Sequence, residues 1–207
     1  MRDELVEVRE EPLDALEDYA RISIAFEVHS RVRVHPPDAV ARTATGEWCV
    51  EPVDPPWRKD YDAAPGHHPT AWRMMLPSSC GQVLAARAEG ARVGGGIVLC
   101  AASDIDLLEG RSDVALLWDL RVDPGWRGRG VGTALFHAAA RWGLEHGCLE
   151  LLVETQDINV PACRFYARQG CRLSACRRHA YVECPHEIQL LWRLDLRAAA
   201  FAPVYAL

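Results

Sequence analysis

The sequence has no long apolar run and no excess of positive charge. No stretch of about 18 consecutive apolar residues occurs, although a membrane-spanning helix needs roughly that length. The opening MRDELVEVREEPLDALEDYA is charged throughout and lacks the apolar core of a secretory signal peptide. The formal net charge of −6 disfavours a nucleic-acid-binding protein and is compatible with a cationic substrate. We therefore expect a soluble, cytoplasmic protein with neither a membrane nor a nucleic acid as partner.

Paired cysteine motifs are also absent, because the eight cysteines form no CxxC pair. Cysteines beside apolar strand-like runs, such as Cys100 and Cys148, can pack as small hydrophobic side chains. An alternative is a metal site on one loop, with Cys-x-x-His and Cys-x-His spacings, whose ligands would be Cys176, His179, Cys184 and His186. We favour free thiols and predict no metal site.

No internal repeat or low-complexity segment occurs, and the composition, 49% hydrophobic and 25% charged, is that of an ordinary globular protein. A chain of 207 residues suits one domain with a sizeable core. We predict a single domain over residues 1–197 and an apolar tail, 198–207, that packs on the domain or on a neighbour. A homodimer is compatible with the sequence, but no pattern indicates it.

Strands are predicted from short apolar or alternating runs, and helices from propensity and apolar spacing. Residues 12–22 are predicted as a helix. The next segment, 23–35, is predicted to continue this helix at first and to become extended at 31–34. Residues 35–79 are rich in proline, which predicts loops around one strand at 47–51. Seven further strands are predicted at 5–9, 82–87, 93–100, 115–122, 149–155, from 171, and at 188–194.

The most informative stretch, residues 116–133, reads LLWDLRVDPGWRGRGVGT. An apolar strand ends at Asp123-Pro124-Gly125, because proline lacks the ladder N–H and glycine turns freely. Glycines then lead into a predicted helix over about 134–142. The free N–H groups at a helix start bind anions, and glycine lets a phosphate approach the backbone. The stretch therefore predicts a phosphate-binding turn, with a solvated glycine-rich turn as the alternative.

Two other phosphate-binding patterns fail on specific residues. A dinucleotide fingerprint needs a third glycine where Thr133 stands. A nucleotide P-loop starting at Gly125 needs a lysine and a hydroxyl residue where Val131 and Gly132 stand. The pattern that remains is Arg127-x-x-Gly130-x-Gly132 after a strand.

This pattern resembles the acetyl-CoA pyrophosphate loop of the GCN5-related N-acetyltransferases (GNAT). A second motif, ELLVETQDINVPACRFYARQGCRL at 150–173, resembles that family's strand, Asn-opened helix with Phe-Tyr, glycine and strand. The part VETQDINVPACRFYARQGC is similar to streptothricin acetyltransferases and their relatives. The resemblance covers roughly residues 80–195. It implies an α+β (α/β) GNAT fold, in which helices flank a central mixed seven-stranded sheet whose parallel strands splay apart at the acetyl-CoA site.

Carried onto this chain, the resemblance assigns cofactor contacts. The strand residues Leu120, Arg121 and Val122 would meet the pantetheine arm through backbone groups. Asn159 would reach the same arm or only cap its helix. Cys163 and Tyr166, which share its face at helical spacing, are further candidate cofactor contacts. The pyrophosphate would be held by Arg127, Gly128, Arg129, Gly130, Val131, Gly132 and Thr133. No metal is implied.

The chemistry requires a proton acceptor and a proton donor. An alkyl amine with a pKa near 10.4 is mostly protonated at neutral pH and must lose a proton before it attacks the thioester. Glu154 is the first candidate base and Asp119 the second; each could instead be structural. The resemblance places Tyr166 near the sulfur of the leaving CoA, where its hydroxyl would donate a proton. The alternative is that Tyr166 is a buried aromatic residue of the helix without a catalytic role. For Cys163 we favour packing over covalent catalysis, because the motif places no histidine beside it.

The acceptor side is less well defined. Glu27, Asp106 and Glu109 are candidates to bind a cationic end of the substrate. The 35–79 segment is predicted as a lid or wall over the acceptor site. Its aromatic residues would either form that wall or anchor a loop to the core: Trp48, Trp57, Tyr61 and Trp72.

The leading hypothesis is an acetyl-CoA-dependent N-acetyltransferase in which a primary amine of a small molecule attacks the thioester directly, with a streptothricin-like antibiotic as one candidate acceptor. Acetylation of a protein or peptide amine is one alternative and would need an open groove. A non-catalytic acetyl-CoA-binding sensor is another.

Overall fold

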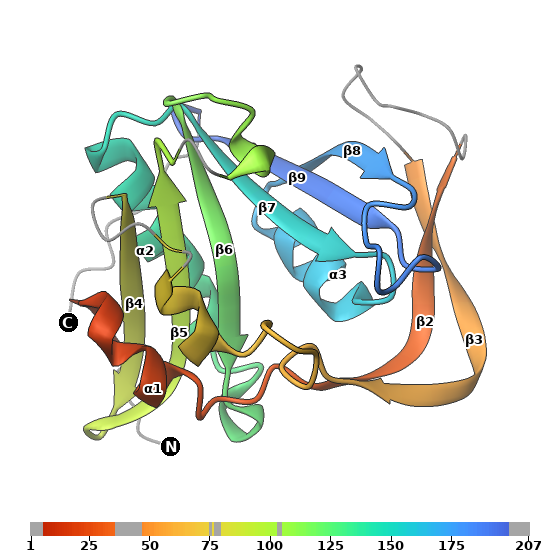
Figure 1. The fold of residues 1–207 in the computed structure, drawn as a ribbon, viewed down its shortest axis with the longest axis horizontal. Coiled ribbons are helices and arrows are strands. Elements are labelled where there is room, and N and C mark those ends of the chain that lie inside the picture. The colour runs from red at the N-terminus through yellow and green to blue at the C-terminus, as the bar shows by residue number, and fades with distance from the viewer. Residues whose placement is uncertain (1–5, 36–46, 75, 77–79, 103–104, 199–207) are drawn as a thin grey trace.

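The computed structural model describes residues 6–35, 47–74, 76, 80–102 and 105–198, and its centre is a seven-stranded sheet (Figure 1). The strands lie in the order β1-β4-β5-β6-β7-β9-β8. Only β6 and β7 pair in parallel, so the sheet is mixed, as predicted. The strand bounds are β1 Glu7–Glu11, β4 Gly81–Ala88, β5 Ala91–Cys100, β6 Val114–Val122, β7 Glu150–Gln156, β8 Arg172–Arg177 and β9 Gln189–Asp195.

The predicted hairpin over residues 82–100 is confirmed by the antiparallel pairing of β4 with β5. Its two connecting residues, Glu89 and Gly90, both have positive φ, 50° and 83°. Such a turn matches the right-handed twist of the flanking strands. The predicted β-α-β unit also forms, with α2 (Val131–Glu145) between the parallel strands β6 and β7.

Helices cover both faces of the sheet, and consecutive glycines in β5 show how closely they approach. A Cβ on Gly94 would lie 2.9 Å from a methyl carbon of Val131 in α2. A Cβ on Gly95 would lie 2.6 Å from the ring of Tyr19 in α1 (Leu16–Tyr19). Because neighbouring strand residues point to opposite faces, α1 and α2 lie on opposite sides of the sheet, as Figure 1 shows.

The third helix, α3 (Val160–Arg168), packs on the α2 side, where the Phe136 and Phe165 rings meet edge to face at 6.0 Å. Short 3₁₀ helices connect the other elements: η1 Leu13–Ala15, η2 Pro69–Met74, η3 Asp106–Leu108 and η4 Pro124–Trp126. Among the described helices, none combines the length and apolar character needed to cross a membrane.

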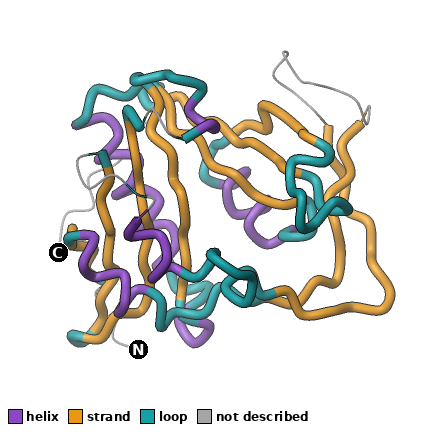
Figure 2. The backbone as a smooth tube through the Cα atoms, in the orientation of Figure 1, coloured by secondary structure: helices purple, strands orange, loops and turns teal. Residues whose placement is uncertain are grey.

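A second sheet was not predicted. Strands β2 (Phe26–His35) and β3 (Glu47–Lys59) pair antiparallel and form a long arm beside β8 and β9, the β2–β3 arm (Figures 1 and 2). The prediction that helix continues past residue 22 is therefore wrong. Val28 and Val32 are buried and four residues apart, a spacing that a helix and a strand both place on one face. The predicted helix over 12–22 is reduced to η1 and α1.

The strand predicted at 47–51 forms, but the loop predicted after residue 51 is wrong. Strand β3 continues to Lys59 and contains three prolines. The register shifts between Val28 and Ser30, whose partners are Trp57 and Pro52. The intervening residues of β3 include Pro55 and Pro56, which therefore lie in a bulge where no ladder N–H is needed.

Some predictions fall outside the described residues. These are the predictions for Leu5, for 36–46, 75 and 77–79 within the proline-rich segment, and for 199–207 of the tail.

Candidate active site

The site begins where the parallel pairing of β6 and β7 stops. The two strands pair from Val114 opposite Glu150 to Leu117 opposite Val153, and no further pair follows. A cavity of about 560 Å³ opens beyond that point. It is lined from β6 by residues 116–121, from β7 by Glu154, Thr155 and Gln156, and from the α3 region by Asn159, Ala162 and Tyr166. The predicted splay is thus present.

A glycine-rich turn connects β6 to α2. Asp123 ends the strand and accepts a hydrogen bond from the Gly125 N–H at 2.9 Å. Gly128 and Gly130 have φ of 77° and 84°, values that favour glycine. Gly130 is the N-cap of α2 and supplies no side-chain hydrogen bond to the helix. The first N–H groups of α2 are therefore available to an anion, as the sequence predicts.

The arginines of this turn have structural partners. Arg127 donates to the Val122 carbonyl at 3.1 Å and reaches the carbonyls of Ala25 and Ser23 at 3.4 and 3.5 Å. It therefore ties the turn to the segment before β2. The Arg129 guanidinium lies 5.1 Å from the Trp126 ring.

The opening of α3 follows the prediction closely. The Asn159 side chain caps the helix by accepting from the Ala162 N–H at 3.2 Å, and it also lines the cavity. Cys163 is fully buried beneath this surface, with its sulfur 3.4 Å from the Thr155 hydroxyl. Burial raises the pKa of the Cys163 thiol to about 12, which keeps it protonated and supports a packing role.

Tyr166 lines the cavity from α3 and is only 6% exposed. Its ring packs against Phe136 and Phe165, at 5.9 and 5.1 Å between centroids. Burial raises the pKa of its hydroxyl above the ordinary value, so the phenol remains protonated at neutral pH. A protonated phenol beside the gap can donate a proton.

The two candidate bases have different surroundings. Glu154 accepts a hydrogen bond from the Tyr181 hydroxyl at 2.6 Å, and burial raises the pKa of its carboxyl. Among the described side chains, no basic group lies within ion-pair distance of Glu154. Asp119 instead accepts from Tyr19 at 3.0 Å and forms a buried ion pair with Arg121 at 2.7 Å.

Arg121, predicted to meet the cofactor through its backbone, has a side chain that is engaged within the protein. Its guanidinium is 1% exposed and also binds Asp62 at 2.8 Å and the Ile22 carbonyl at 3.1 Å. It faces the Tyr19 ring, at 5.1 Å. The side chain is therefore part of the framework, and its main chain pairs with Gly95 of β5.

The far side of the cavity contains residues that the sequence patterns did not single out. Glu187 is nearly buried, accepts a hydrogen bond from Tyr61 at 2.7 Å and forms an ion pair with Lys59. Lys59 also donates to the Cys184 sulfur at 3.3 Å. This side is formed by residues 59–67 and 180–187, which include the acidic Asp60, Asp62, Glu183 and Glu187.

The three predicted substrate carboxylates Glu27, Asp106 and Glu109, all within the described chain, are exposed and lie outside the cavity lining. Glu109 pairs with Arg177 at 2.8 Å. The predicted aromatic wall is divided. Tyr61 and Trp72 line the cavity, whereas Trp48 packs edge to face on Trp192 at 5.9 Å and Trp57 is 41% exposed.

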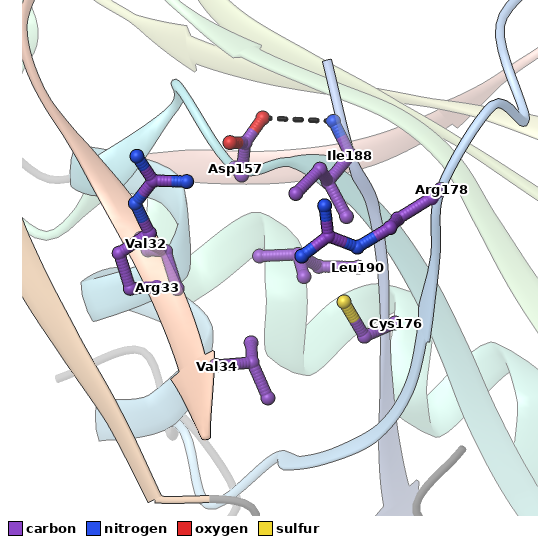
Figure 3. A pocket seen from close by; sticks show the side chains of 8 residues that line it. All are labelled: Val32, Arg33, Val34, Asp157, Cys176, Arg178, Ile188 and Leu190. Carbon is purple, nitrogen blue, oxygen red and sulfur yellow. Dashed lines mark hydrogen bonds between the residues drawn. The ribbon is translucent and has the colours of Figure 1, made fainter. Parts of the chain in front are cut away.

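A second, smaller cavity of about 80 Å³ lies between β2 and the β8–β9 region (Figure 3). Asp157 lies at its rim and accepts from the Ile188 N–H at 2.8 Å, the dashed line in Figure 3. Its other oxygen binds Arg31 of β2 at 2.8 Å. Asp157 therefore joins the β2–β3 arm to the start of β9. Nowhere in the described part of the chain do three or more His, Cys, Asp or Glu side chains gather as a metal site.

The mixed sheet, the interrupted parallel pair and the glycine turn before α2 define the class of protein. Residues 47–171 match the Acetyltransferase (GNAT) family, and the chain belongs to that family.

Among curated proteins, the chain is 41% identical to streptothricin acetyltransferase A of Bacillus subtilis (strain 168) over 80 residues, 38% of this chain and 46% of the relative. It is 33% identical to the streptothricin acetyltransferase of Escherichia coli over 91 residues, 42% of this chain and 52% of the relative. The matches thus span about half the length of these relatives.

Two solved structures share the fold over most of both chains. A nourseothricin acetyltransferase superposes with a TM-score of 0.69 at 23% identity, covering 92% of this chain and 98% of the other. A Bacillus anthracis protein assigned as a streptothricin acetyltransferase, in complex with acetyl coenzyme A, gives 0.72 at 22% identity, with 92% and 99% covered.

Proposed function

We propose that this protein is an acetyl-CoA-dependent N-acetyltransferase whose acceptor is a primary amine of a small cationic molecule, such as a streptothricin-like antibiotic. One observation carries the proposal. A single cavity of about 560 Å³ lies in the gap between β6 and β7 and continues to an acidic far side. The curated relatives named as streptothricin acetyltransferases support the choice of acceptor.

The residues present suit acetyl-CoA as cosubstrate. Beyond Leu117, the β6 backbone is no longer paired with β7, which leaves peptide groups of Leu120 and Val122 for the amides of pantetheine. The uncapped N–H groups at the start of α2, from Gly130 onward, suit the pyrophosphate. Asn159 can serve as helix cap and meet the pantetheine arm at the same time.

Transfer then needs three proton movements besides the attack. The amine nitrogen forms a bond to the acetyl carbon, and the carbon–sulfur bond breaks. Glu154 takes the proton from the incoming ammonium, directly or through water, because its carboxylate lines the cavity without a neutralising cation. Tyr166 gives its phenolic proton to the departing thiolate. The second proton that the nitrogen loses as the amide forms restores the phenol, directly or through water. The ion pair with Arg121 leaves Asp119 a structural role.

The acceptor side favours a small molecule over a protein segment. Residues 59–67 and 180–187 enclose the cavity opposite the gap, and the contacts of Lys59 and Tyr61 with Glu187 join the two segments. A lysine peptide would need an open groove here. Asp62 and Glu187 already have cationic partners, Arg121 and Lys59. Of the other carboxylates that line the cavity, those of Glu154, Asp60 and Glu183 suit an acceptor with more than one ammonium group.

The test is release of free CoA thiol from acetyl-CoA with a panel of amines: streptothricin, polyamines, aminoglycosides and lysine peptides. We expect turnover with the small polycationic amines of this panel, streptothricin above all, and not with the lysine peptides. Tyr166→Phe should lower kcat about 100-fold or more, the usual scale of general acid catalysis, without changing the Kd for acetyl-CoA.

Three outcomes would contradict the proposal. Turnover only with lysine peptides would identify a protein acetyltransferase. Binding of acetyl-CoA without turnover on any amine would identify a sensor. Failure to bind acetyl-CoA would remove the assignment altogether.

A further inference from the structure

The loop between β8 and β9, residues 178–188, is fastened to the β2–β3 arm at its C-terminal end. Arg31 of β2 donates to the His186 carbonyl at 2.8 Å. Tyr61 and Lys59, at the end of β3, both bind Glu187. The next residue, Ile188, donates its N–H to Asp157. These contacts hold a connection without regular secondary structure in one position beside the cavity.

The same loop places Tyr181 against Glu154. The Tyr181 oxygen lies 2.6 Å from Glu154 Oε1, and both side chains line the cavity. Gln156, two residues after Glu154 on β7, donates its amide N–H to the Tyr181 oxygen at 3.4 Å. Because Gln156 acts as donor in this contact, the Tyr181 proton is directed to the carboxylate.

We propose that Tyr181 is a positioning residue for the acetyl transfer: its hydroxyl orients the Glu154 carboxylate in the cavity and favours the ionised form that accepts the proton of the amine. This inference rests on the proposed function and adds to it a residue outside both family motifs. The β2–β3 arm has a part in it, since the arm fixes the loop that carries Tyr181.

Other groups around Glu154 do not replace this contact. Gln189 of β9 also hydrogen-bonds Glu154, and Arg177 of β8 lies close enough to act on its charge. The Arg177 guanidinium, however, is bound to Glu109 at 2.8 Å. Across the gap stand Asp119, already paired with Arg121, and Tyr166 of α3. Tyr181 therefore supplies the short O–H donor that favours the charged carboxylate.

The test compares Tyr181→Phe with wild type in pH profiles of kcat/KM and kcat, using one acceptor from the amine panel so that titration of the amine is common to both. A donor to a charged group favours the ionised state, so its removal should move the acidic limb up by about one pH unit. The Kd for acetyl-CoA should stay unchanged, and kcat should fall more than KM rises.

Tyr61→Phe is the matched control, because Tyr61 also lines the cavity and donates to a carboxylate, that of Glu187, at 2.7 Å. It should leave the acidic limb in place. In a Glu154→Gln background, Tyr181→Phe should cause no further loss of kcat. An unshifted acidic limb, a shift equally large in Tyr61→Phe, or an additive loss in the double variant would each overturn the inference.

The Glu154 carboxyl carbon provides a readout independent of turnover. Titrated by ¹³C NMR and assigned with Glu154→Gln, its pKa should be higher in Tyr181→Phe than in wild type. An equal pKa would overturn the inference even if no amine in the panel were a substrate. Inactive wild type with a shifted Glu154 pKa would count against the proposed function alone.

Discussion

Arg121 determines which carboxylate of the gap remains available. Its guanidinium is shared by Asp119 and Asp62, at 2.7 and 2.8 Å, and Tyr19 donates to the same Asp119 oxygen. The Asp119 carboxylate therefore has its donors already. Glu154 has no such cation, and that difference assigns the two acidic residues of the gap to different roles.

Replacement of Arg121 by methionine should destabilise the protein strongly. It would leave Asp119 and Asp62 without their buried counter-charge, and removal of one partner from a buried pair costs about 3–5 kcal/mol. The free energy of unfolding, measured by urea denaturation, checks this. Arg9→Met is the control, because the Arg9–Glu7 pair is exposed, and it should change stability by less than about 0.5 kcal/mol. Equal losses in both variants would refute the role given to Arg121.

Individual site residues could be predicted from the sequence only where they belong to a recognisable local motif. Asn159 and Tyr166 lie in a helix whose cap and spacing are readable along the chain, and both line the cavity. Tyr181 and Glu187 lie in an irregular loop without periodicity. They reach the cavity only through contacts with β3 and β7, which no local pattern records.

The Asn159 side chain caps α3 and is proposed to contact acetyl-CoA, and variants of Asn159 can separate these two roles. Asn159→Ala removes the cap on Ala162 and should lower the free energy of unfolding by about 1 kcal/mol. Asn159→Asp keeps an oxygen that caps the helix but loses the amide donor. We expect the Asp variant to retain stability in chemical denaturation and to bind acetyl-CoA more weakly in calorimetry. Unchanged affinity would leave Asn159 as a cap alone.

Among the elements, β2 and β3 show the limit of pattern analysis. The prolines of β3 indicate loop, yet the strand forms because Pro55 and Pro56 lie in a bulge of a two-stranded pair. The spacing of Val28 and Val32 in β2 fits a helix and a strand equally well. In contrast, the strands of the main sheet have runs or alternations that only a strand satisfies, and the seven were predicted in their correct chain order.

The stability of the entire domain should also depend on the ionisation of Glu154. Burial raises the pKa of Glu154 above its ordinary value of 4.5, so the folded state holds this proton more tightly than the unfolded state. Stability from this group is therefore full below the unfolded pKa and is lost as pH rises through the folded pKa. At about pH 8 the wild-type carboxyl is charged, so Glu154→Gln should unfold at a higher temperature than wild type. At about pH 4 the carboxyl is mostly protonated, and the difference should vanish.

Differential scanning calorimetry at both pH values measures this. Glu183→Gln is the control, because the Glu183 side chain is exposed and its replacement should change the unfolding temperature little. A Gln variant that is less stable than wild type at the higher pH would show that Glu154 contributes to the fold.

The ion pair between Lys59 and Glu187 has a consequence for self-modification. Lys59 is the only lysine among the 23 basic residues, and it faces the cavity proposed to hold a reactive thioester. Burial alone would lower the pKa of Lys59, but its hydrogen bonds to Glu187 and Cys184 raise it. The ε-amine is thus kept as an ammonium ion without a lone pair for attack. An enzyme that acetylates amines would in this way keep its one lysine in a form that cannot attack the bound thioester, and would avoid acetylating itself there.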